Sequence, residues 1–387
     1  MKLHPVVGHQ AVLKAIAHAR IADSLPSSIL LHGPKGVGKQ RIALWMAQLL
    51  VCEEPTAEGP CQACRSCRMA LGVEHPDLHW YFPLPRPKGA SGDRLVSALE
   101  DARVRALAEH RAEPVRASHD GELRGLYLGV VKNIRARALL RPTMAKGQIF
   151  IVGDAELLVP QESSPEAANA LLKLLEEPPG ASRFILTSSE PGRLLATLRS
   201  RTVALHVPPL ATDQVETFLM DAASVEPGEA RWAAQLSQGS IGRALGFLPD
   251  GDKKGPLEAL RRRAYTLVEA ALSEGSAAGY TAAASYPPAK ARKFVDLFPF
   301  VEAWLRDLAA VASGAGEHVL NRDASASLEQ MVKRRGIAAA DLTLALSAVE
   351  DARELARGNV NPQLVMSGLI RTIQRRVPPR AHLERVR

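Results

Sequence analysis

All four cysteines of the chain lie in one short stretch, one helix downstream of a glycine-rich phosphate loop. Cys52, Cys61, Cys64 and Cys67 follow the spacing C-x8-C-x2-C-x2-C. Four thiolates can surround one tetrahedral zinc ion, and such a closed site is structural because it leaves no open position for chemistry. We therefore predict a Zn²⁺ module inserted after the first helix of a phosphate-loop domain.

The overall composition limits the classes of protein that fit. A length of 387 residues predicts two or three domains. The first five residues contain no apolar signal core, and no apolar stretch reaches membrane-spanning length, so we expect a cytoplasmic protein. In a reducing compartment, clustered cysteines favour metal binding over disulfides. The net charge of +8 favours an acidic partner such as nucleic acid, but aromatic content of 4% disfavours a base-stacking platform.

The first part of the chain alternates between strand-like and helix-like patterns. Short apolar runs predict strands, and amphipathic segments between them predict helices. This alternation is typical of an α/β fold with a parallel sheet and helices on both faces. The expected strands are 28–32, 78–82, 149–152, 183–187 and 203–207, and the expected helices are 40–51, the region around Ile134, and 167–175.

The remaining segments differ in character. Residues 87–125 interrupt the alternation, and we interpret them as an exposed, partly helical insertion without an assigned function. A small helical unit is expected over 211–248, followed by turn and linker residues at 249–256. Long helical periodicities then predict an all-helical domain. Its expected helices are 257–273, 288–312, 339–356 and 362–377, which gives domains at 1–209, 210–250 and 255–387.

The phosphate loop lacks one of its usual parts. Gly33, Gly36 and Gly38 allow backbone N–H groups to turn toward phosphate oxygens, and Lys39 can reach the β- and γ-phosphates. The next position normally carries a Ser or Thr that ligates magnesium, but here it is Gln40. The pattern leaves open whether ATP or ADP binds, and it argues against Mg²⁺.

A second defect follows the strand at 149–152. A hydrolytic site normally has an Asp for magnesium there and then a Glu that activates water. In one register Gly153 takes the place of the Asp, and Asp154 that of the Glu; in the other, Asp154 is the metal ligand and Ala155 replaces the base. Either register loses one group. Because phosphoryl transfer depends on positioning and charge stabilisation, we expect almost no hydrolysis.

Several motifs together resemble the bacterial clamp-loader subunits, which are AAA+ proteins of the DNA polymerase III holoenzyme. The segment 168–179, ANALLKLLEEPP, is the most characteristic, and the cysteine spacing is similar to the zinc module of the family. The resemblance covers the chain except for about 87–125. Further similar segments are 7–10 near the adenine, His75-Pro76-Asp77 after the zinc module, the sensor-1 strand end at Thr187, the Ser-Arg-Cys signature at 198–202 with Thr202 in place of Cys, the sensor-2 helix at 239–245, and the last collar helix at 359–364.

This resemblance implies an AAA+ domain with an inserted zinc module, a helical lid and an all-helical collar. Motor subunits, called gamma or tau, keep a complete ATP site, whereas the stator, delta prime, has an eroded site and keeps an arginine finger. Gln40 and Gly153 thus point to the stator type. The resemblance implies that Arg201 is a finger acting in trans on a neighbour's ATP site, and that Arg243 belongs to the degenerate nucleotide site.

Motor and delta subunits are the implied partners, with the sliding clamp and primed DNA reached through the complex, in a cytoplasmic replisome associated with the nucleoid. DNA polymerase activity would belong to the assembly, not to this chain. The alternative is an ATP-hydrolysing motor subunit of the gamma/tau type, for which Asp154 and Glu156 leave room. A zinc-dependent nucleic-acid binder acting alone is a third interpretation, which the low aromatic content disfavours.

Overall fold

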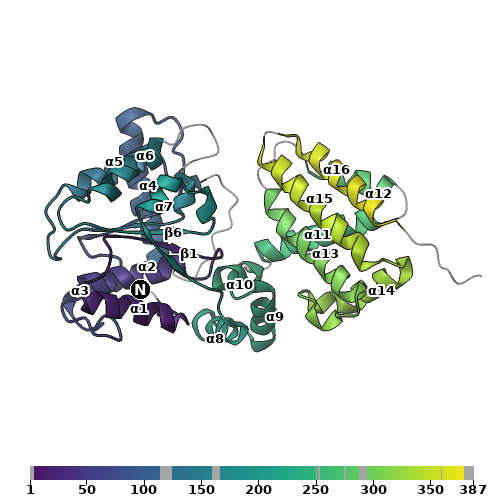
Figure 1. The fold of residues 1–387 in the computed structure, drawn as a ribbon, viewed down its shortest axis with the longest axis horizontal. Helices are drawn as coiled ribbons and strands as arrows, with labels where there is room; N and C mark the ends of the chain where they lie inside the picture. Colours follow the sequence, from purple (N-terminus) through teal and green to yellow (C-terminus); the bar gives the residue numbers. More distant parts are fainter. Residues whose placement is uncertain are drawn as a thin grey trace, which may run out of the picture. The chain divides into compact units, whose positions relative to one another are not determined.

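The computed structural model describes residues 4–113, 124–158, 166–249, 251, 253–273, 276–286, 294–358 and 360–378. The chain divides into two compact units, Met1–Leu245 and Gly246–Arg387 (Figure 1). Each unit is described separately below. Among the described residues, no helix has both the length and the apolar character that crossing a membrane requires.

The first unit is built on a five-stranded parallel sheet. Its strands are β1 (Ser28–His32), β2 (Leu78–Tyr81), β5 (Ile149–Val152), β6 (Arg183–Ser188) and β7 (Val203–His206), in the order β2-β5-β6-β1-β7. The five strands match the sequence prediction to within one residue at each end. A separate antiparallel pair joins β3 (Leu84–Pro85) and β4 (Arg124–Gly125). The α/β fold class is therefore confirmed.

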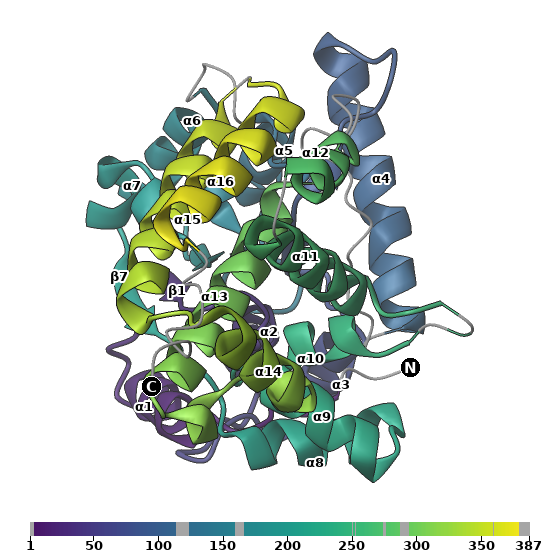
Figure 2. The same ribbon diagram turned by 90° about the vertical axis from the view of Figure 1, so that its right-hand side faces the viewer.

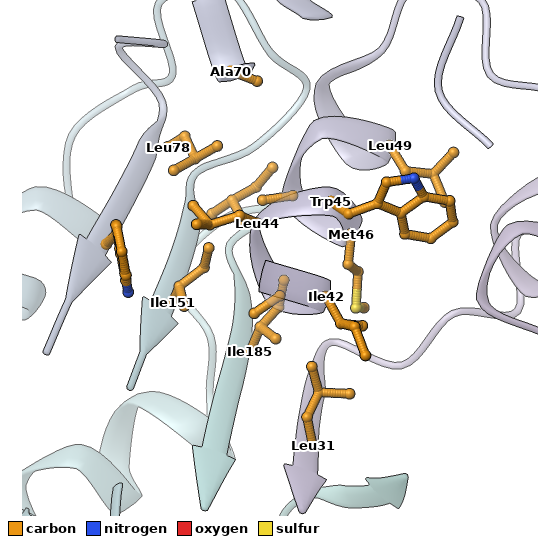
Figure 3. Close-up of a cluster of buried hydrophobic side chains, with 14 of the residues drawn as sticks. Leu31, Ile42, Leu44, Trp45, Met46, Leu49, Ala70, Leu78, Ile151 and Ile185 are labelled. Atoms are coloured by element: carbon orange, nitrogen blue, oxygen red, sulfur yellow. The ribbon is translucent and has the colours of Figure 1, made fainter. Parts of the chain in front are cut away.

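Successive residues of the strands enter two different cores, one on each face of the sheet. In β5, for example, Ile149 and Ile151 belong to one core, and Phe150 and Val152 to the other. The first core is covered by α1 (Gln10–Ile21), α2 (Lys39–Val51) and α3 (Arg65–Leu71) (Figures 1 and 3). The second is covered by α5 (Leu128–Ala138), α6 (Glu166–Glu176) and α7 (Ala196–Ser200). Burial on both faces explains the apolar runs of β1, β5 and β6, whereas the edge strand β7 is largely exposed.

The described part of the insertion is a surface helix with one buried side. Helix α4 (Gly92–Ala112) confirms the predicted helical character, and most of its residues are exposed or half-buried, but Leu99, Arg103 and Leu107 are buried. Leu99 joins one core of the sheet and Leu107 the other. The helix therefore contributes to both cores next to β2, the edge strand, whose unpaired backbone would otherwise be open to another chain. Residues 114–123 of the predicted insertion lie outside the described residues.

Three helices follow the sheet: α8 (Thr212–Ala223), α9 (Pro227–Ser237) and α10 (Ile241–Phe247). Helices α8 and α9 pack against each other, as the predicted small helical unit requires. The chain between α9 and α10 is tied back to the start of this segment, because Leu210 N–H donates to Gly239 O at 2.9 Å. This contact places α10 near the phosphate loop.

The second unit is entirely helical in its described part. It contains α11 (Pro256–Leu272), α12 (Ser276–Ala284), α13 (Phe298–Ala312), α14 (Ser325–Arg335), α15 (Ala339–Arg357) and α16 (Pro362–Arg376). Helix α13 packs against α11, α14 and α15, and α15 packs against α16 (Figure 2). Helices α12 and α14 were not predicted. Helix α13 begins at Phe298, and the stretch 287–293, where a helix from 288 was expected, lies outside the described residues.

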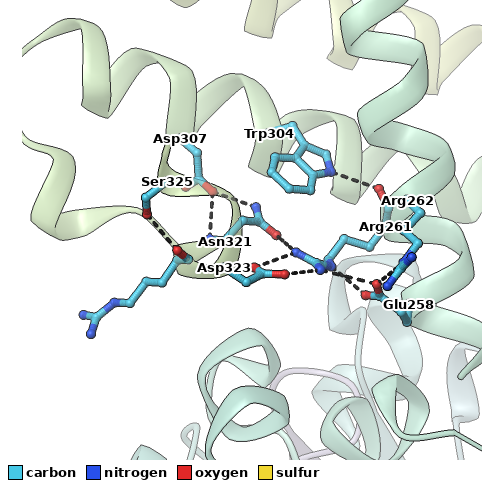
Figure 4. Close-up of polar contacts among 9 residues, drawn as sticks. Glu258, Arg261, Arg262, Trp304, Asp307, Asn321, Asp323 and Ser325 are labelled. Carbon is cyan, nitrogen blue, oxygen red and sulfur yellow. Dashed lines mark hydrogen bonds and ion pairs between the residues drawn. The ribbon is translucent and has the colours of Figure 1, made fainter. Parts of the chain in front are cut away.

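A buried ionic network holds α11 to the segment after α13 (Figure 4). The guanidinium of Arg261 pairs with Glu258 at 2.7 Å and with Asp323 at 2.6 Å, and it donates to Asn321 at 2.9 Å. Asp307, also buried, accepts hydrogen bonds from Asn321 N–H and its side-chain amide. Arg261 and Glu258 are thus paired and Asp307 is hydrogen-bonded, which are the conditions under which buried charges are tolerated.

Candidate phosphate site and cysteine cluster

The phosphate loop joins β1 to the N-terminus of α2, as the sequence predicts. Gly36 has a φ of 80°, and a Cβ there would lie 2.5 Å from the Ser240 hydroxyl, so only glycine fits. Gly242 N–H donates to Gly36 O at 3.0 Å, and Ser240 Oγ–H to Lys35 O at 2.8 Å. The loop is thereby held against the start of α10.

Lys39 is buried and directed back into the loop. Its ammonium donates to Gly33 O at 2.9 Å, to Pro34 O at 2.8 Å and to Ser189 Oγ at 2.9 Å. Burial lowers the pKa of Lys39, while the nearby carboxylates of Asp154 and Glu156 act in the opposite direction. The lysine thus connects the loop to the end of β6, where Ser189 follows the strand.

Gln40 lies against Gly153. A Cβ at Gly153 would meet Cδ and Oε1 of Gln40 at 2.8 Å and Nε2 at 2.9 Å. The Gln40 amide donates to Asp154 Oδ2 at 3.1 Å, and its carbonyl oxygen accepts the indole N–H of Trp80 at 3.1 Å. The two positions that depart from a hydrolytic motif are therefore in direct contact. Trp80, in β2, is a site residue that the sequence reasoning missed; its alternation with Leu78 toward α2 is the signal that could have identified it.

The two acidic residues after β5 also converge on this region. Asp154 N–H donates to Thr187 Oγ1 at 3.0 Å, and burial, followed by the charge of Glu156, raises the pKa of the Asp154 carboxyl. Glu156 Oε1 accepts Ser189 N–H at 2.9 Å. The other oxygen, Oε2, is buried without a hydrogen-bond partner among the described residues. The carboxylates therefore lie beside Lys39 in a weakly solvated site.

Arg243 and Arg201 occupy different environments. Arg243 belongs to α10, its N–H donates to Ser240 Oγ at 3.1 Å, and burial lowers the pKa of its guanidinium. It therefore lies in the segment bound to the phosphate loop. Arg201 directly follows α7, and its side chain is 54% exposed. Arg201 pairs with Glu176 at the end of α6, at 3.3 Å between Nη2 and Oε1, rather than with a residue of the loop.

The four cysteines converge at the junction of α2 and α3. Their sulfur atoms all lie within 4.8 Å of one another. Sulfurs bound to one zinc ion at 2.3 Å are about 3.8 Å apart in a tetrahedron, and Sγ of Cys61 lies 3.9 Å from Sγ of Cys67. Backbone N–H groups of Cys61, Cys64 and Cys67 donate to the sulfurs of Cys52, Cys61 and Cys64, respectively, each at 3.3 Å. The cluster has the ligand type, the spacing and the N–H donors that a thiolate site needs.

Comparison with known proteins gives one consistent family. A family model described as DNA polymerase III, delta subunit, matches residues 8–211. The DNA polymerase III subunit delta' of Bacillus subtilis is 30% identical over 226 residues, which are 58% of this chain and 55% of that protein. The corresponding subunit of Escherichia coli is 31% identical over 218 residues, 56% and 53% of the two chains.

A more distant similarity extends to DNA polymerase III subunit tau of Escherichia coli. It is 26% identical over 245 residues, which are 62% of this chain and 31% of that protein. The chain therefore spans about half the length of the delta' relatives it matches, and less of tau.

Proposed function

The chain belongs to the DNA polymerase III delta subunit family, and we propose that it acts as the delta-prime type of stator subunit in a clamp loader. In this role it assembles with gamma/tau motor subunits and a delta subunit, and the complex loads the sliding clamp on primed DNA. The chain itself does not hydrolyse ATP. The similarity to delta' proteins and to tau supports membership of such an assembly.

The contact between Gln40 and Gly153 is the observation that carries this proposal. Gln40 stands where the motif has a magnesium-ligating hydroxyl, and Gly153 stands where it has a carboxylate. The two positions are in contact, since a Cβ built at Gly153 would lie 2.8 Å from the Gln40 amide. This contact favours the register in which Gly153 replaces the metal-ligating Asp. Phosphoryl transfer requires a metal that neutralises charge on the phosphates, so losing both ligands removes the main catalytic element.

Arg201 is the group that we propose to act on a neighbouring subunit. Its guanidinium is half exposed and lies on the surface of the first unit, where the pair with Glu176 is exposed enough to be exchanged at little cost. An arginine can make two parallel hydrogen bonds to phosphate oxygens. It is suited to stabilise charge on a γ-phosphate held by a motor subunit.

We also propose that the cysteine cluster holds a structural zinc ion. Cys52 ends α2 and Cys64 is the N-cap residue of α3, so a common ion would fix the angle between the two helices. Four cysteine ligands leave no position for substrate or water, and the ion therefore stabilises the fold without taking part in a reaction.

The test is ATP turnover by the purified protein, alone and reconstituted with motor and delta subunits, sliding clamp and primed DNA. Arg201→Ala is compared with Arg199→Ala, which removes an exposed arginine from the same helix end. We expect no turnover by the protein alone. In the complex, Arg201→Ala should abolish ATP turnover at the motor subunit site next to this chain, because an arginine finger is worth about 10³–10⁵ in rate. Arg199→Ala should leave that turnover unchanged. Turnover by the isolated protein that Lys39→Ala stops would instead identify a motor subunit.

A further inference from the structure

We propose that the phosphate site takes a nucleoside diphosphate without a divalent cation, because the Gln40 carboxamide occupies the cation position. This rests on the proposed function, since a stator has no need to hydrolyse its nucleotide, and it specifies the ligand of the same site. Four features of the described residues lead to it: how Gln40 is held, the space at Gly153, what fixes Trp80, and where the charges lie.

Gln40 is held at both ends of its amide. The carbonyl oxygen is used by the Trp80 indole at 3.1 Å, and the NH₂ group faces Asp154 at 3.1 Å. Magnesium requires oxygen ligands in near-octahedral geometry, and an NH₂ group cannot serve as one. The amide N–H thus neutralises part of the Asp154 charge, which a cation would do in a hydrolytic site.

The absence of a side chain at Gly153 makes room for this arrangement. Any residue other than glycine would place Cβ 2.8 Å from the Gln40 amide, so the amide would have to shift away from its bonds to Trp80 and Asp154. Gln40 and Gly153 therefore form a complementary pair, in which the longer side chain fills the space that the missing one leaves. Rather than two independent losses, the pair is one packed arrangement.

Trp80 is itself fixed by the insertion helix α4. Arg103 Nη1–H donates to Trp80 O at 3.3 Å, and the His110 ring lies 5.1 Å from the indole. The Phe82 ring lies 5.0 Å from the indole and 5.1 Å from the His110 ring, so the three rings form one cluster. Because the indole is buried against two rings and the backbone of Trp80 is held by Arg103, we expect the indole N–H to remain directed at Gln40. The insertion thereby acquires a role in keeping the cation position closed.

The charges around the loop favour a nucleoside diphosphate over a triphosphate. Lys39 and the loop favour anions, as phosphate loops do. The carboxylates of Asp154 and Glu156, however, lie beside Lys39, and Glu156 Oε2 has no partner among the described residues. A γ-phosphate would bring further negative charge to these carboxylates without a cation to offset it. A diphosphate avoids this repulsion, so we infer a preference for ADP over ATP.

Calorimetric titration with ADP and with ATP, each in excess EDTA and in millimolar Mg²⁺, tests the proposal on the full chain. For the wild type we expect ADP affinity to be equal in the two media within about twofold, and ATP to bind at least about tenfold more weakly. Lys39→Ala should abolish binding, which assigns the signal to this loop. In Gln40→Thr/Gly153→Asp, Mg²⁺ should strengthen binding at least about tenfold.

Gly192→Asp is the matched control for the added charge, because a Cβ there meets nothing within 4 Å. It should behave like the wild type. The proposal is overturned if Mg²⁺ strengthens wild-type binding about tenfold or more, if ATP binds as tightly as ADP, or if neither nucleotide binds. The binding of ADP and ATP to the wild type, with and without Mg²⁺, tests the proposal even if the double variant does not fold. If Arg201→Ala does not change ATP turnover by the complex, the stator role is refuted, but the nucleotide-binding results are not affected.

Discussion

Asp77 is expected to be a principal anchor of the strand that leads into the phosphate site. Its carboxylate is fully buried and accepts backbone N–H bonds from Thr143, Met144 and Ala145, each at 2.7 Å. These residues lie in the loop that enters β5, and β5 ends at Gly153. Asp77 therefore joins the edge strand β2 to the strand that positions Gly153 and the acids after it.

The cost of Asp77→Asn follows from these bonds. The new amide must direct its NH₂ group either at Thr143 N–H or at the N–H groups of Met144 and Ala145. The cheaper orientation loses one charge-assisted bond, worth about 1.5–3 kcal/mol, and weakens the other two to neutral bonds worth about 1 kcal/mol each. We expect a loss of at least about 2.5 kcal/mol, and up to about 7 kcal/mol, in the free energy of opening this part of the sheet.

Hydrogen exchange of the β2 and β5 amides is the appropriate assay, since it measures opening of these strands without a contribution from the second unit. Asp101→Asn, at an exposed position of α4, is the matched control and should change the opening free energy by less than about 0.5 kcal/mol. A change below about 1 kcal/mol in Asp77→Asn would refute the reasoning, because at least one buried charged bond must be lost.

The same anchor predicts a pH dependence. Burial by itself would raise the pKa of Asp77, but the three backbone N–H bonds outweigh it and lower the pKa. A carboxyl whose folded pKa is depressed contributes stability above its unfolded pKa of about 3.9, and this contribution is lost as the pH falls through the lower folded value. Opening of β2 and β5 should therefore become easier below about pH 4 in the wild type, and this dependence should shrink in Asp77→Asn.

Three further predictions concern other parts of the chain. Cys64→Ser, which removes the N-cap sulfur of α3, should reduce bound zinc from equimolar to near zero by metal analysis and expose α3 amides to exchange. Burial lowers the pKa of His79 to about 4, so stability should fall as the pH drops from about 6.5 toward about 4, and His79→Gln should remove this slope in denaturation curves. Arg261→Met should destabilise the second unit by about 3–5 kcal/mol in urea unfolding, because it removes the buried partner of the buried Glu258 and also the pair with the exposed Asp323. Arg262→Met should cost less than about 1 kcal/mol.

Burial explains which elements could be predicted from sequence. Strands β1, β5 and β6 are buried on both faces, so each contains an apolar run with clear ends, whereas the edge strand β7 is largely exposed. Helix α12 was missed because its Ala- and Gly-rich residues form no distinct apolar stripe, and α14 because only Leu328 is buried in it. Helix α4 was recognised as helical, but its few buried residues, among charged ones, gave no sign that it packs beside β2.

The candidate sites were predictable to different degrees for a related reason. The cysteine cluster is local in sequence, and its spacing alone predicts the convergence that the structure has. Gln40 and Gly153 are far apart in the chain, and the sequence alone indicates only that each replaces a magnesium ligand. Only the parallel arrangement of β1 and β5 with α2 brings them into contact, and only then does the bond to Trp80 become visible.

This contact changes how an eroded site should be interpreted. If the hydroxyl and the carboxylate had simply been lost, the space and the charge of Asp154 would remain, and a buried unpaired carboxylate is costly. Gln40 fills the space and donates to Asp154, so the site is stable without a metal. Restoring one ligand alone should therefore not restore a metal site. Gly153→Asp would push the Gln40 amide away from its hydrogen-bond partners. Gln40→Thr would leave Trp80 and Asp154 without their common partner. Reversal requires both changes together, which is why the two positions should vary as a pair.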